Sequence, residues 1–211
     1  MKPNILWITT DQHQASCLGC MGNDIIQTPN LDRLAAEGVL FENTFCQSPA
    51  CMSSRGSFLT GRYPSAIRVH GMGILPPQET TFPEWVQRHG YKTGGFGKLH
   101  LTPEQYTLTE LKSDIPNTDW RTFAELAHLT DIPEDPCKEN YGFQEFHWYE
   151  DILKGNHREW LKQKAPELLE LEPEKFEDGP GDLYVSPYPS EYHPSPFIPN
   201  KTEEFIRAQA D

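Results

Sequence analysis

The sequence predicts an α/β fold, because short apolar segments typical of strands alternate with capped helical segments. Residues 4–10, Asn-Ile-Leu-Trp-Ile-Thr-Thr, form an apolar run that favours a buried strand. Thr28 as N-cap, Pro29 at the first helical position and a terminating Gly38 then predict a helix. The apolar residues within 39–45 predict the next strand. The alternation therefore starts at the beginning of the chain.

Composition limits the classes of function. The 211 residues suffice for one domain with a substantial core, and 36% hydrophobic content with 19 prolines indicates a globular, loop-rich chain. The net charge of −13 argues against nucleic-acid partners, which require a basic surface. The same charge would not steer an anionic substrate over long range. Any anion site must therefore use a few local cations.

The first residues favour a cytoplasmic protein without a membrane partner. The apolar run at residues 4–10 is too short for a signal peptide, and Asp11 ends it. No segment of the sequence reaches the length needed to span a bilayer. We therefore expect a cytoplasmic location.

The cysteines are more typical of free thiols than of a disulfide framework in such a compartment. Cys17 and Cys20 form a Cys-x-x-Cys pair that could be joined with Cys46 and Cys51 into a zinc site. The second pair has a spacing of five positions and no histidine completes a familiar zinc pattern. A thiolate zinc site is therefore the weaker alternative.

Residues 48–62 contain the strongest candidate for chemistry. Cys51 precedes Arg55 by four residues, a spacing that places both on one face of a helix. Pro49 suits the start of this helix and Gly61 suits its end. A thiol at a helix N-terminus beside a guanidinium is suited to an anion or an activated nucleophile. The structural alternative is a buried, inert cysteine.

Asp11 is a second candidate, since it directly follows the first predicted strand. In open α/β sheets, ligands bind outside the carboxyl ends of the strands. A carboxylate at this edge suits a hard divalent cation. Capping of the following turn is the structural alternative.

A third candidate follows the next predicted helix and strand. Thr81 caps a helix that ends near Gly90, and residues 91–96 favour a strand. Alternation in an extended segment would place Lys98 and His100 on one side. A cation beside an imidazole could stabilise an oxyanion and transfer a proton, whereas a solvated edge is the structural alternative.

Residues 51–62, Cys-Met-Ser-Ser-Arg-Gly-Ser-Phe-Leu-Thr-Gly-Arg, closely resemble the signature of the formylglycine-dependent sulfatases. Ser53 departs from the Pro or Ala usual in that family. The opening strand with its aspartate, the Thr-Pro-Asn-Leu-Asp-Arg-Leu-Ala helix and the Gly-Lys-x-His-Leu segment are also similar to sulfatase segments. The resemblance covers residues 1–101 well and 186–211 loosely. It implies an alkaline-phosphatase-like fold, in which helices cover both faces of a central, mostly parallel sheet.

The resemblance implies a modified nucleophile and a metal. Cys51 would be oxidised by a formylglycine-generating enzyme to formylglycine, whose hydrate attacks the sulfur atom. Asp11 and residue 51 would bind a divalent cation, expected to be Ca²⁺, with Mg²⁺ or Mn²⁺ as alternatives. Arg55 would hold the nucleophile in place.

The resemblance also implies how the substrate is bound. Lys98 would contact the sulfate and the formylglycine, and His100 would assist breakdown of the sulfated hemiacetal. His70 would face the substrate, although a surface-loop role is equally compatible with the sequence. The implied activity is hydrolysis of a small-molecule or saccharide sulfate ester.

The chain is expected to be the N-terminal portion of one sulfatase catalytic domain, with an insertion at residues 102–185 and a helix at 202–210. Sulfatases are usually more than twice this length, and their further metal and catalytic ligands lie in the C-terminal half. One alternative is a phosphonate or phosphate monoester hydrolase of the same superfamily. The other is an inactive relative that acts as a non-catalytic binding protein. The related phosphonate hydrolases commonly lack a Lys-x-His pair, so Lys98 and His100 favour sulfate chemistry.

Overall fold

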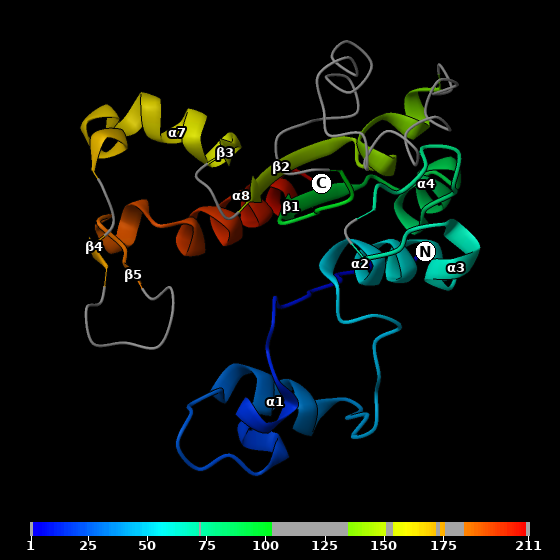
Figure 1. The fold of residues 1–211 in the computed structure, drawn as a ribbon, viewed down its shortest axis with the longest axis horizontal. Helices are drawn as coiled ribbons and strands as arrows, with labels where there is room; N and C mark the ends of the chain where they lie inside the picture. The colour runs from blue at the N-terminus through cyan, green and yellow to red at the C-terminus, as the bar shows by residue number, and fades with distance from the viewer. Residues whose placement is uncertain are drawn as a thin grey trace. The chain divides into compact units, whose positions relative to one another are not determined.

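The computed structural model describes residues 2–71, 73–102, 135–150, 154–171, 174–175 and 184–209. The chain forms two compact units, Met1–Phe45 and Cys46–Asp211, and each is considered by itself (Figure 1). No helix in the described part of the chain is both long enough and apolar enough to cross a bilayer. The first unit contains the 3₁₀-helices η1 and η2 and the helix α1: Ala15–Cys17, Gly19–Met21 and Pro29–Glu37.

Helix α1 confirms the prediction made from its capping residues. It begins at Pro29 and its first turn is tied to η2 through two polar side chains. Asp32 Oδ1 accepts hydrogen bonds from the Thr28 hydroxyl at 2.9 Å and the Cys20 amide at 2.8 Å. The Gly19 amide in turn donates to Thr28 Oγ1 at 2.8 Å. The Thr28 side chain makes no capping bond to the first turn, so the position of the helix is confirmed but the expected capping bond is not.

The strands predicted at residues 4–10 and 39–45 are wrong for the described residues of the first unit, where neither segment is a strand. Their apolar side chains are exposed, Ile8 by 70% and Phe41 by 76%. A strand requires a partner that accepts its backbone hydrogen bonds, and strand propensity cannot supply one. The apolar pattern therefore indicated extended chain but not pairing.

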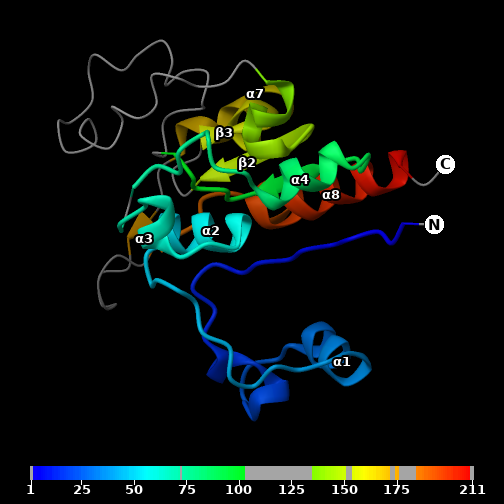
Figure 2. The same cartoon turned by 90° about the vertical axis from the view of Figure 1, so that its right-hand side faces the viewer.

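The second unit carries a small sheet. Its described elements, in chain order, are α2 Cys51–Thr60, α3 Pro64–Ile67, α4 Phe82–Arg88, β1 Gly94–Gly97, η4 Pro136–Gly142, β2 Glu145–Glu150, β3 Lys154–Gly155, α7 Asn156–Lys164, η5 Pro166–Glu170, β4 Glu174–Lys175, β5 Tyr184–Val185, η6 Ser190–Tyr192 and α8 Pro194–Ala208. Strand β1 pairs in parallel with β2, and β2 pairs antiparallel with β3. Strands β4 and β5 form a separate antiparallel pair. Helix α8 packs along β1 and β2 (Figures 1 and 2).

Three predicted elements of the second unit are confirmed. Helix α2 ends at Gly61, whose φ of 68° is the left-handed conformation that favours glycine. Helix α4 begins after Thr81, whose hydroxyl accepts a hydrogen bond from the Glu84 amide at 3.3 Å. Strand β1, Gly94–Gly97, overlaps the second half of the strand expected at residues 91–96.

Two findings go beyond the sequence prediction. Strand β2 lies inside the range interpreted as an insertion, residues 102–185, yet it pairs with β1 in the same sheet. Of that range, residues 103–134, 151–153, 172–173 and 176–183 lie outside the described residues. A helix was predicted from residue 202, but α8 begins eight residues earlier. Proline usually ends a helix, whereas α8 contains Pro199 in its interior.

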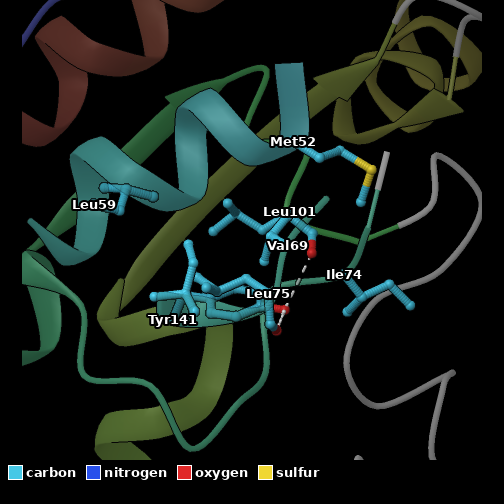
Figure 3. Close-up of a cluster of buried hydrophobic side chains, with 8 residues drawn as sticks. Met52, Leu59, Val69, Ile74, Leu75, Leu101 and Tyr141 are labelled. Carbon is cyan, nitrogen blue, oxygen red and sulfur yellow. Dashed lines mark hydrogen bonds between the residues drawn. The ribbon is translucent and has the colours of Figure 1, made fainter. Parts of the chain in front are cut away.

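A hydrophobic core lies beneath α2. It consists of eight buried residues (Figure 3): Met52, Leu59, Ile67, Val69, Ile74, Leu75, Leu101 and Tyr141. Gly56 allows α3 to approach α2, since a Cβ atom there would lie 3.0 Å from Ile67 Cδ1. The core therefore joins α2 to the segments on either side of β1.

Candidate active site

The first turn of α2 presents Cys51, which is half-buried at the first helical position. The turn is held by Ser48, whose Oγ accepts hydrogen bonds from the Ala50 amide at 3.2 Å and the Ser53 hydroxyl at 2.7 Å. Backbone N–H groups at a helix N-terminus favour negative charge. Residue 51 therefore lies where an anionic nucleophile or a bound anion is stabilised.

Arg55 lies one turn further along α2 and is 7% exposed. Its guanidinium donates a hydrogen bond to the backbone carbonyl of Lys98. This bond joins α2 to the segment that follows β1, although the two residues are 43 positions apart in the chain. Because a guanidinium remains protonated in proteins, Arg55 places a permanent positive charge near Cys51.

The segment from Lys98 to His100 leaves β1 in an irregular conformation. Gly97 has a φ of 98° and His100 a φ of 49°, so both residues are left-handed. Lys98 is half-buried and His100 is buried. The two side chains therefore do not occupy a regular extended segment, and simple alternation does not describe their arrangement.

His70 is exposed in the loop after α3. The carbonyl of the next residue, Gly71, accepts a hydrogen bond from the Ser53 amide at 3.3 Å. This bond holds the loop against the first turn of α2. The structure thus gathers Cys51, Arg55, the Lys98 segment and the His70 loop around one helix.

Asp11 lies in the first unit and is exposed. Its predicted sharing of a metal with residue 51 stays a prediction. Among the residues that the structure describes, no three His, Cys, Asp or Glu side chains are grouped so that they could hold a metal ion.

Sequence reasoning missed Tyr141, which lies in η4 and is buried. Its hydroxyl donates to the carbonyl of Leu75 at 3.0 Å and approaches that of Leu101 at 3.4 Å. Burial raises the pKa of the Tyr141 phenol, which is already a donor at neutral pH. The Asn-Tyr-Gly sequence, typical of a turn, was the only signal for this residue in the sequence, and it does not reveal the distant partners.

Comparison with known proteins identifies a family model that matches most of the chain and curated relatives that match about half of it. The family model for sulfatases matches residues 3–204. An arylsulfatase of Clostridium perfringens is 42% identical over 110 residues, which are 50% of this chain and 22% of the relative. A steryl-sulfatase of Rattus norvegicus is 43% identical over 111 residues, 47% of this chain and 19% of the relative. The matched region is thus about a fifth of the length of these curated relatives.

A solved structure shows the same fold. The crystal structure of a phosphonate monoester hydrolase of Agrobacterium radiobacter superposes with a TM-score of 0.69 and 24% sequence identity. The match covers 100% of this chain and 39% of that one. The predicted α/β, alkaline-phosphatase-like fold is therefore confirmed for the portion present here.

Proposed function

This chain belongs to the sulfatase family, and from this premise we propose that the protein it forms part of hydrolyses sulfate esters by means of residue 51. The observation that carries the proposal is the arrangement on α2. Cys51 occupies the first turn, and the buried Arg55 one turn later bonds to the backbone of Lys98. One helix thereby presents the nucleophile precursor beside a fixed positive charge.

Residue 51 would act after oxidation of the thiol to formylglycine by a formylglycine-generating enzyme. The hydrated aldehyde would supply a hydroxyl nucleophile that a thiol cannot provide. Arg55 would orient this side chain, since both residues project from one face of α2. The hydrogen-bonded first turn around Ser48 and Ser53 keeps the backbone of residue 51 in place.

Lys98 and His100 would handle charge and proton transfer. The Lys98 ammonium would neutralise the sulfate oxygens as negative charge develops. The His100 imidazole would accept a proton from the remaining hydroxyl of residue 51. His70 would contact the ester group of the substrate from its loop, which the Ser53–Gly71 bond holds near α2.

A divalent cation is the other family feature, and Ca²⁺ is the expected ion, with Mg²⁺ or Mn²⁺ as alternatives. Asp11 and residue 51 would be the ligands supplied by this chain. Ca²⁺ takes about six to eight oxygen ligands, so these two residues do not complete a site, and we assign no step to the ion.

The substrate would be a small-molecule or saccharide sulfate ester. A second candidate activity is hydrolysis of phosphonate or phosphate monoesters, which the fold similarity to the phosphonate monoester hydrolase favours. Sulfate and phosphate monoesters are both tetrahedral oxyanions that a cationic site can bind. The Lys98–His100 pair favours the sulfate ester over this alternative.

The test uses the full-length protein produced together with a formylglycine-generating enzyme. Peptide mass spectrometry should find formylglycine at residue 51, and an aryl sulfate should be turned over faster than the matching aryl phosphate or phosphonate. Cys51→Ala should reduce the sulfatase kcat by at least about a thousandfold, whereas Cys46→Ala, at an exposed cysteine, should leave it unchanged. An unaltered rate in Cys51→Ala would refute the mechanism, and preferential turnover of the phosphonate would favour the second candidate.

A further inference from the structure

We propose that Tyr141 is a positioning residue that fixes His100 through the backbone of Leu101. The catalytic consequence of this inference rests on the function proposed above. The claim that Tyr141 holds the backbone beside His100 in place rests on geometry alone.

The Tyr141 hydroxyl lies within the hydrophobic core and reaches two backbone carbonyls. It lies 3.0 Å from the oxygen of Leu75 and 3.4 Å from the oxygen of Leu101, as drawn in Figure 3. The Leu75 amide also donates to the Leu101 carbonyl, at 3.0 Å. Leu101 directly follows His100, and its carbonyl accepts from the Leu75 amide while the phenol, whose nearer acceptor is the Leu75 carbonyl, lies beside it.

The backbone of His100 requires such support. Its φ of 49° is left-handed, a conformation that residues with a Cβ atom rarely adopt. Such conformations persist where the surroundings over-determine them, and they cluster at functional sites. His100 is 4% exposed and Leu101 is 1% exposed, so packing and the two hydrogen bonds act together.

The backbone around Tyr141 is held in place by hydrogen bonds to neighbouring segments. The consecutive residues Asn140, Tyr141 and Gly142 have φ values of 46°, 54° and 92°. Thr81 Oγ1 donates to the Tyr141 carbonyl at 2.6 Å, and Thr93 Oγ1 donates to the Gly142 carbonyl at 2.7 Å. The turn is thus tied to the start of α4 and to the chain before β1, and it directs the phenol into the core as a fixed donor.

The test is Tyr141→Phe in the full-length protein, which keeps the ring and removes the hydroxyl. If His100 acts after substrate binding, kcat for an aryl sulfate should fall about 10- to 100-fold while KM changes less than about twofold. In a His100→Ala background the same substitution should change kcat by less than about twofold, because a residue that acts through His100 has nothing left to position. Tyr192→Phe, a matched change beside the second hydrophobic cluster around Leu161, should leave kcat unchanged.

Hydrogen exchange at the Leu75 amide separates this inference from the proposed function. Tyr141→Phe should accelerate this exchange by about tenfold or more if the phenol holds the Leu75–Leu101 pairing. Accelerated exchange in a protein that hydrolyses no sulfate ester would support the positional role and overturn the proposed function. Unchanged exchange, or an equal loss of kcat with and without His100, would overturn the inference.

Discussion

Gly142 provides the sharpest test of how the second unit is assembled. A Cβ atom at this position would lie 2.1 Å from the Glu84 amide nitrogen and 2.5 Å from its Cα. These are backbone atoms in the first turn of α4, so no rotamer change can relieve the overlap. Gly142→Ala must therefore move η4 away from α4, and the Tyr141 hydroxyl moves with it.

The expected cost has three parts. A left-handed φ of 92° penalises alanine by about 1–2 kcal/mol. Overpacking against fixed neighbours costs about 1–3 kcal/mol. Loss of the Thr93–Gly142 hydrogen bond costs about 1 kcal/mol. Gly142→Ala should therefore lower the free energy of unfolding by about 3–6 kcal/mol.

Gly61→Ala is the matched control in the same unit. Gly61 is also left-handed, with a φ of 68°, but a Cβ atom added there would meet no described atom within 4 Å. Its substitution should cost only about 1–2 kcal/mol. Urea unfolding of the full-length protein, followed by tryptophan fluorescence, compares the two. Equal shifts of the unfolding midpoint would show that η4 does not pack against α4 in this way.

Three further predictions concern the core, a buried histidine and the active site. Met52→Ala should lower the free energy of unfolding by about 2–5 kcal/mol, because Met52 is 1% exposed within the core. Urea unfolding measures this loss of stability. Burial lowers the pKa of His157, so the folded state favours the neutral ring and the free energy of unfolding should fall as the pH drops below about 6.5. Thermal unfolding between pH 5 and 8 tests this sign, and His157→Phe should flatten the dependence. In the full-length protein, Arg55→Lys should reduce the proposed sulfatase kcat about 10- to 100-fold, because a lysine cannot reproduce the guanidinium bond to the Lys98 carbonyl. Steady-state kinetics measure the loss.

A buried ion pair gives a fifth prediction. The Glu84 carboxylate is 3% exposed and its Oε2 lies 2.8 Å from Lys138 Nζ, whereas Arg88 contacts Oε1. Lys138→Met should cost about 2–3 kcal/mol, because it leaves one oxygen of a buried carboxylate without its cation. Lys162→Met, at an exposed pair with Glu159, should cost less than about 1 kcal/mol. Similar costs in the two variants, measured by urea unfolding, would contradict this account.

The sequence by itself determined the features that depend on neighbours along the chain. Helices α1, α2 and α4 lie where prolines at or near their starts and glycines at or near their ends predicted them, because these signals act within a few residues, and Thr81 also caps α4 as predicted. The spacing of Cys51 and Arg55 likewise sufficed to place both on one helix. The family resemblance of residues 51–62 then pointed to sulfatase chemistry.

Tertiary structure alone decided what meets across the chain. The parallel pairing of β1 with β2 joins Gly95 to Phe146, and residues 4–10 show that an apolar run without a partner is no strand. The Arg55 bond to Lys98 and the Tyr141 bonds to Leu75 and Leu101 also join distant segments. No local pattern encodes such contacts, because a hydrogen bond between distant residues forms only after the core has brought their backbones together.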